Sequence, residues 1–247
     1  MRVRNDSLIR VLPCGDTALV IELGNVVDKA LNARVLALAA AIERAAILGV
    51  SEVVPTFRSL MLHYDPLQTS HDAIKKEIEP LIGAAPAELP PGRRWTLPVC
   101  YEPEFGLDLE EVSRRLAIPQ ERVIELHAGT PLRVYMLGFL PGAPYLGDTA
   151  KELALPRREN PRVKVPRGSV AIALNQSVVY PFESPGGWHI LGRTPVRLYD
   201  QRRESPVLLR PNDEVRFLPV SRARHDDLER RAEAGEAIEL DVAELAS

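Results

Sequence analysis

Basic side chains concentrate in PRRENPRVKVPRGS, residues 156–169. They are Arg157, Arg158, Arg162, Lys164 and Arg167, with a single acid among them. Lysine and arginine donate charged hydrogen bonds to carboxylates and phosphates, arginine through a planar fork. We therefore expect residues 156–167 to form an anion-binding edge. A solvated basic face is the alternative interpretation.

A second stretch, PFESPGGWHILGRTP at 181–195, holds groups that could transfer protons. Glu183 and His189 are those groups. The adjacent Gly186 and Gly187 predict a rigid turn over residues 184–188, in which the glycines either adopt backbone angles closed to other residues or make a contact too close for a Cβ. Trp188 and His189 enter a predicted strand as neighbours, so their side chains should face opposite sides. Trp188 would then be the pocket wall, and His189 would be structural rather than catalytic.

Two further segments supply flat apolar walls, GFLPGAPYLG (138–147) and NQSVVYP (175–181). Their aromatic residues include Phe139, Tyr145 and Tyr180. Proline fixes φ, so loops of this composition can present side chains with little ordering cost on binding. They predict a preformed pocket for a small ligand, although a loop of this kind can also be only a connection.

Familiar autonomous catalytic motifs are absent from the sequence. It has no Walker phosphate loop, no G-x-S-x-G serine motif and no H-E-x-x-H zinc motif, and its five histidines lack metal-ligand spacing. Cys14 and Cys100 match no metal or redox pattern, which is typical of a reducing cytoplasm. A net charge of −3 gives no general attraction to nucleic acid or membrane, and no apolar run reaches the ~20 residues of a membrane span.

The N-terminal third has the pattern of an α+β sandwich. Strands are predicted at 17–23, 52–57 and 59–64, and amphipathic helices at 28–48 and 70–83. Asp28 and Ser70 lie where helix N-caps are expected, Gly49 where a helix would stop, and Pro55 favours an edge strand.

The remainder predicts a second domain. The segment 84–93, rich in proline and glycine, is interpreted as a linker after a domain at 1–83. A strand at 93–100 and two helices follow, the first with Asp108 and Glu111 spaced as a capping box. Short strand-like runs then occur at 132–137, 170–174, 177–182, 189–192, 195–200, 206–209 and 214–220, which indicates a β-barrel or sandwich over 94–222. The tail, 223–247, predicts a solvated helix and a short terminal strand.

Together these segments resemble the KipI / PxpB family. That family includes the B-type component of bacterial ATP-dependent 5-oxoprolinase, allophanate hydrolase subunit 1 and the carboxyltransferase domain of urea carboxylases. The likeness covers about residues 8–220 and is most specific in ESPGGWHILGRTP and PRRENPRVKVPRGS.

The resemblance implies an α+β protein with a C-terminal cyclophilin-like β-barrel. It also implies a non-autonomous subunit that acts with a homologous C-type subunit (KipA / PxpC-like) and an A-type subunit. The complex would open 5-oxoproline to glutamate with ATP as co-substrate, which could be held by another subunit. Two alternatives remain: a KipI-like regulator that inhibits a sensor histidine kinase, and a carboxyltransferase or allophanate hydrolase type of subunit in urea or amide metabolism.

The expected site follows from these segments and the resemblance. Glu183 or His189 would handle protons, Arg157, Arg158 and Lys164 would face developing negative charge, and Gln176 and Tyr180 would orient the substrate. The remaining expected ligand contacts are Tyr145, Ser184, Gly186, Gly187 and Trp188, and no metal is expected.

The sequence also departs from the family pattern. Ala143 stands where an aromatic residue is usual, and Asp148, Ala171, Leu174 and Val178 stand where glycines are usual. A side chain in place of glycine can fill a pocket or oppose a positive φ. We therefore expect an altered ligand geometry around Gln176.

Overall fold

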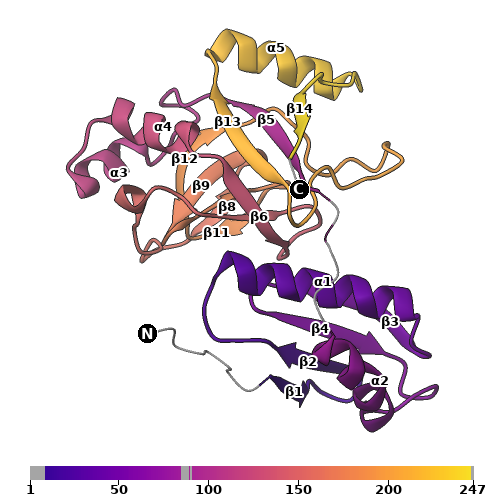
Figure 1. The fold of residues 1–247 in the computed structure, drawn as a ribbon. Helices are drawn as coiled ribbons and strands as arrows, with labels where there is room; N and C mark the ends of the chain where they lie inside the picture. Colours follow the sequence, from indigo (N-terminus) through magenta and orange to yellow (C-terminus); the bar gives the residue numbers. More distant parts are fainter. Residues whose placement is uncertain (1–8, 85–88, 90, 246–247) are drawn as a thin grey trace. The chain divides into compact units, whose positions relative to one another are not determined.

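The chain folds into two units, residues 1–90 and 91–247, which are described separately (Figure 1). The computed structural model describes residues 9–84, 89 and 91–245. Residues 85–88 and 90 of the predicted linker lie outside this described part.

The first unit is a four-stranded antiparallel sheet with two helices. The strand order is β1 (Arg10–Pro13), β2 (Ala18–Glu22), β4 (Ser59–Tyr64), β3 (Val50–Pro55), and the helices are α1 (Lys29–Ala45) and α2 (His71–Gly83). The alternating apolar positions of β2 and β4 meet the apolar stripes of both helices in one core. The predicted α+β sandwich is therefore confirmed, with β1 as an additional strand.

Caps and an edge position explain where these elements begin and end. The Asp28 carboxylate accepts a hydrogen bond from the Leu31 amide (2.9 Å), and the Ser70 hydroxyl accepts one from the Ala73 amide (3.2 Å). Helix α1 ends at Ala46, in the left-handed conformation, three residues before the predicted stop at Gly49. Pro55 ends β3, which is an edge strand as expected.

The second unit is built on an eight-stranded sheet. Its order is β12 (His189–Arg193), β9 (Ser169–Ala173), β10 (Gln176–Val179), β7 (Pro144–Gly147), β6 (Leu132–Leu137), β13 (Glu214–Pro219), β5 (Arg93–Val99), β14 (Asp241–Glu244). Among the described strand pairs, only β13–β5 is parallel. Strands β8 (Arg162–Val165) and β11 (Ser184–Gly186) form a separate two-stranded sheet. The helices are α3 (Leu109–Leu116), α4 (Gln120–Gly129), the short η1 (Lys151–Leu153) and α5 (Arg222–Glu233).

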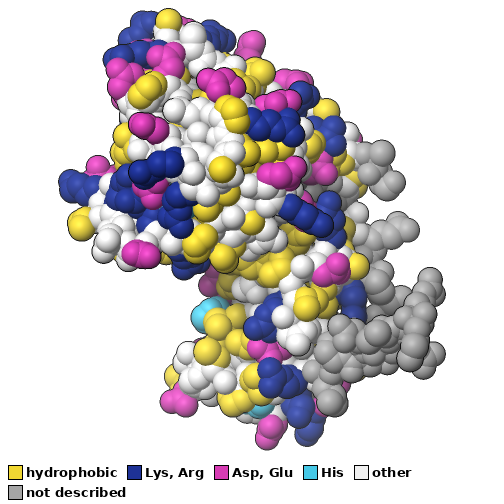
Figure 2. Space-filling view, turned by 90° about the vertical axis from the view of Figure 1, so that its left-hand side faces the viewer, with side chains coloured by type: hydrophobic (Ala, Val, Ile, Leu, Met, Phe, Trp, Pro, Cys, Tyr) yellow, Lys and Arg dark blue, Asp and Glu magenta, His cyan; other side chains and the backbone are white. Residues whose placement is uncertain are grey.

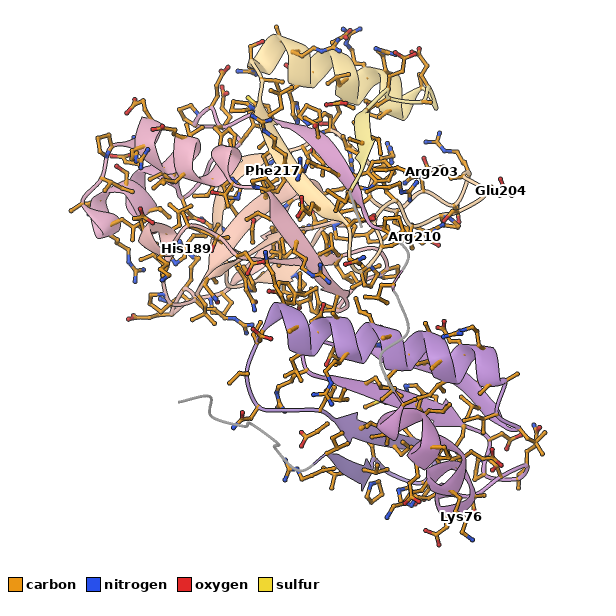
Figure 3. All side chains as sticks on the ribbon, in the orientation of Figure 1. Lys76, His189, Arg203, Glu204, Arg210 and Phe217 are labelled. Atoms are coloured by element: carbon orange, nitrogen blue, oxygen red, sulfur yellow. The ribbon has the colours of Figure 1, made fainter. Side chains whose placement is uncertain are left out.

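The described strands do not close into a barrel, because β12 and β14 remain edge strands of the large sheet. An isolated bridge connects the end of β5 to β12: Cys100 and Arg193 exchange two backbone hydrogen bonds of 2.9 Å. The main apolar core lies against this sheet and includes Phe217, labelled in Figure 3. The mixed α/β character is thus as expected, and the closed barrel is not observed.

Several predicted elements differ in the structure. Segments 195–200 and 206–209 are irregular and share one bridge, Tyr199–Val207; each begins with a proline, which cannot donate to a ladder. Strands β7, β8 and β11 are present in stretches predicted as loops. The C-terminal strand is confirmed as β14, which pairs with β5, and α5 buries Leu228 and Ala232 instead of being fully solvated. No helix in the described part of the chain has the length and apolar character to cross a membrane.

Candidate functional site

A cavity of about 240 Å³ lies in the second unit, between β10, β11 and the segments that precede β7 and β8. The predicted site residues that line it are Tyr145, Arg157, Arg158, Tyr180, Gly186, Gly187 and Trp188. Its other lining residues are Phe139, Leu140, Ala143, Pro161, Val178, Val179, Pro181 and Pro185. Segments far apart in the sequence therefore supply one small, largely apolar cavity with two guanidinium groups.

Aromatic rings form one wall of the cavity. Trp188 is 6% exposed, and its ring meets that of Tyr145 edge to face, with 6.2 Å between centroids. Trp188 and Ile190 pack in a cluster with Tyr180, whereas Leu191 packs in the main core. The expected alternation along this strand is therefore observed.

Arg157 is the exposed cation of the cavity. Its guanidinium lies 5.6 Å from the centre of the Trp188 ring, a cation–π contact. Within the described parts of the chain it forms no ion pair. Burial raises the pKa of Tyr180 to about 12, against the opposing effect of the Arg157 charge. Tyr180 is accordingly a neutral phenol at physiological pH and can donate a hydrogen bond.

Arg158 is held in a buried ion-pair network. Its Nη1 donates to Asp108 Oδ1 (2.7 Å) and Glu111 Oε2 (3.0 Å), and Arg162 binds both oxygens of Asp108. The predicted capping box is therefore wrong: Asp108 precedes α3 but makes no side-chain cap, because its carboxylate is taken by the two arginines and the Ile190 amide. Figure 2 views the side of the second unit where α3, β8 and β11 lie, and shows Lys and Arg clustered there with acidic neighbours.

The predicted turn at 184–188 is instead a short strand, followed by Gly187 outside regular structure and a bend at Trp188. Residues 184–186 form β11, paired with β8 across a register shift, and neither glycine has positive φ. The second explanation, close approach, holds at Gly186, since an added Cβ would lie 2.3 Å from the Tyr180 hydroxyl oxygen. At Gly187 the nearest atom would be 3.5 Å away, an ordinary contact.

The remaining predicted residues do not line the cavity. Glu183 and Lys164 are exposed and pair with each other at 3.1 Å. His189, labelled in Figure 3, is fully buried. Its Nε2 lies 2.9 Å from the Pro156 carbonyl oxygen. Gln176 begins β10, and Ser184 is buried in β11. These positions do not support proton transfer by Glu183 or His189 at the cavity.

His127 lies in the core of the second unit and not at the cavity. His127 Nδ1 lies 2.8 Å from the Tyr101 hydroxyl oxygen, and its Nε2 lies 3.0 Å from the Ser177 hydroxyl oxygen. Burial lowers the pKa of His127 to about 3. It stacks on Phe217 inside the core. No group of three or more His, Cys, Asp or Glu side chains in the described part of the chain could hold a metal ion.

Comparison with known proteins identifies the family of this chain. Residues 9–209 match the family described as carboxyltransferase domain, subdomain C and D. This chain belongs to that family. The B-type component of 5-oxoprolinase from Bacillus subtilis (strain 168) is 38% identical over 84% of this chain and 91% of its own length. The protein of the same name from Escherichia coli O157:H7 is 37% identical over 83% and 93%. The predicted relationship to the B-type component of 5-oxoprolinase is confirmed.

Two solved structures resemble this chain in fold. The crystal structure of TTHA0988 is 40% identical with a TM-score of 0.74, over 83% of this chain and 40% of that one. This chain therefore spans less than half of that protein. Kluyveromyces lactis urea amidolyase superimposes with a TM-score of 0.80 over 96% of this chain and 16% of its own, at 21% identity, which shows a shared fold.

Four of the five residues that depart from the expected motifs fall into two structural groups, and the fifth, Ala171, is buried in β9. Leu174 and Asp148 keep left-handed backbone angles, with φ of 56° and 68°, at positions where glycine is usual. Ala143 and Val178 line the cavity, the first with a smaller side chain than the usual aromatic and the second with a larger one than glycine. Two of these residues therefore lie at the cavity, and two others have backbone angles that glycine favours.

Asp108 was not among the residues predicted for this site. The neighbouring residue types predict a cap, and only the folded chain brings Asp108 to Arg158 and Arg162, which are 50 and 54 residues away along the chain. Pro161, Val178 and Pro185 lie in segments that were predicted to form the pocket. The sequence does not show which residues of those segments line the cavity and which are buried behind it.

Proposed function

We propose that this chain is the B-type component of an ATP-dependent 5-oxoprolinase, which opens 5-oxoproline to glutamate. One observation carries the proposal: a chain related over most of its length to such components holds a small cavity with aromatic walls and an arginine that has no ion-pair partner among the described residues. The substrate is a compact five-membered lactam with one carboxylate. A cavity of about 240 Å³ suits such a molecule, because it is smaller than the roughly 300–1,000 Å³ of sites for drug-sized ligands.

The lining residues have distinct tasks in this proposal. Trp188 and Tyr145 pack against the ring, and Arg157 binds the carboxylate through a charged hydrogen bond. Tyr180, a neutral phenol, donates a hydrogen bond to the lactam oxygen. Glu183, Lys164, Gln176, Ser184 and His189 lie outside the cavity and have no substrate contact in this scheme.

An unactivated amide is a poor electrophile, and ATP would activate it by phosphorylating the lactam oxygen. Water could then attack the lactam carbon, and phosphate would leave. The cavity of this chain is suited to the lactam and is too small for a nucleoside triphosphate as well. We therefore infer that the nucleotide is held mainly by a partner protein of the complex. This chain would hold the ring, exclude water from its apolar faces and stabilise the negative charge on the substrate.

The partners and setting follow from the same assignment. The chain would act with the C-type and A-type subunits in the cytoplasm, where ATP is available. We also infer that the second unit corresponds to a cyclophilin-like barrel that is nearly closed, with the Cys100–Arg193 bridge where the strands return to each other.

Reconstitution tests this assignment. We expect the purified chain alone to release no glutamate from 5-oxoproline and ATP, and to do so when the C-type and A-type subunits of the same organism are added. Trp188→Ala should raise KM in the complex, because it removes a cavity wall. Glu183→Gln is the matched control and should leave the kinetics unchanged, because that side chain is outside the cavity.

Two results would contradict the proposal. Full turnover by the isolated chain would exclude a non-autonomous role. An absence of 5-oxoproline turnover by the complete complex would favour the regulatory alternative, which binding to a sensor histidine kinase would then test.

A further inference from the structure

The segment 156–162, which brings Arg157 and Arg158 to the cavity, is fixed by a buried carboxylate outside it. Asp108 is 2% exposed, and each of its oxygens accepts two hydrogen bonds. Oδ1 binds Arg158 Nη1 and Arg162 Nη2, both at 2.7 Å, and Oδ2 binds Arg162 Nη1 and the Ile190 amide, both at 2.8 Å. This carboxylate has no acceptor capacity left, so its charge is fully used within the protein.

Two backbone contacts fix the same segment from the side of β12. The Arg158 amide donates to the Gly187 carbonyl oxygen (2.8 Å). His189 Nε2 lies 2.9 Å from the Pro156 carbonyl oxygen, which can only accept, so this nitrogen carries the hydrogen. The residues on both sides of Arg157 are therefore anchored, and Arg157 itself extends over Trp188.

The three arginines of this segment differ in whether they have an acidic partner. The side chains of Arg158 and Arg162 are 21% and 24% exposed and share Asp108, with Glu111 as a second partner of Arg158. Arg157 is exposed at the cavity and has no acidic partner among the residues that the structure describes. A ligand anion would have to displace the partly buried contacts with Asp108 and Glu111 to use Arg158, whereas Arg157 needs no such exchange.

We propose that Asp108 is a positioning residue which neutralises Arg158 and Arg162 and leaves Arg157 as the cation that binds the anionic group of the ligand. This inference rests on the proposed function of the cavity. It assigns ligand recognition to Arg157 and not to the adjacent Arg158, and it makes Asp108 the residue that holds Arg158 in place. Without Asp108, Arg158 and Arg162 would be free to compete for the ligand and to shift the segment.

Arginine reactivity tests this arrangement without any substrate. The full-length chain is treated with phenylglyoxal for short times, and modification is located by mass spectrometry. We expect Arg157 to react at least several-fold faster than Arg158 and Arg162. In Asp108→Asn, Arg158 and Arg162 should both become reactive, whereas the control Glu111→Gln should expose Arg158 only slightly and leave Arg162 protected.

The relative reactivity of the arginines in the wild-type chain can by itself contradict the proposal, so the test does not depend on the variant being folded. Equal reactivity of Arg157 and Arg158 in the wild type, or unchanged protection in a folded Asp108→Asn protein, would exclude the assigned role. Circular dichroism and thermal unfolding establish that each variant is folded.

Kinetics of the complete complex give the second readout. Arg157→Gln should raise KM for 5-oxoproline about 10- to 100-fold, as expected for loss of a charged hydrogen bond, with a smaller change in kcat. Asp108→Asn should also raise KM, and combining it with Arg157→Gln should add little. Additive effects of the two changes would contradict positioning through Asp108. If the wild-type complex does not act on 5-oxoproline, the proposed function fails, and the reactivity pattern still decides the role of Asp108.

Discussion

A Cβ added at Gly186 would lie 2.3 Å from the Tyr180 hydroxyl oxygen, whereas one at Gly187 would lie 3.5 Å from Pro161. We expect Gly186→Ala to lower the free energy of unfolding by about 1–3 kcal/mol, because the Tyr180 ring must move within a packed cluster. Gly187→Ala is the matched control and should change it by less than about 0.5 kcal/mol. Urea unfolding of the full chain measures both values. Equal losses for the two variants would exclude close approach as the reason for Gly186.

At the scale of elements, two aspartates that precede helices act differently. Asp28 caps α1 through the Leu31 amide, whereas Asp108 bonds to arginines and not to α3. We expect Asp28→Ala to destabilise the first unit by about 1 kcal/mol, and Asp28→Asn to change stability by only a few tenths, because asparagine is an equally good cap. Thermal or urea unfolding compares them. A similar loss in both variants would show that the carboxylate charge, not the cap, is responsible.

At the scale of the whole molecule, the two units meet in sequence near residue 90. The proline- and glycine-rich composition of 84–93 has little to bury, so we expect a broad-specificity protease to cleave there first. Mass spectrometry should find two fragments that correspond to the units. First cleavage within 140–195 would contradict this boundary, because those residues form the cavity and the strands around it.

The sequence by itself determined the elements whose signals are local. Alternation places Leu60, Leu62 and Tyr64 on one face of β4, and side-chain caps mark the starts of α1 and α2. Proline- and glycine-rich segments also indicated where a pocket would form, because they allow rigid backbone without regular structure. The family relationship followed from the same segments, and comparison confirmed it.

Only the tertiary structure decided which of those residues share the cavity. Asp108 has the spacing of a helix cap, yet its carboxylate binds two arginines that lie 50 and 54 residues further along the chain. Alternation predicts that His189 faces away from Trp188, but only the fold brings the Pro156 carbonyl oxygen to its Nε2. The close contact of Gly186 with Tyr180 likewise depends on strand pairing. Long-range pairing sets these partners, and a linear pattern of residue types contains no distances between segments that meet only after folding.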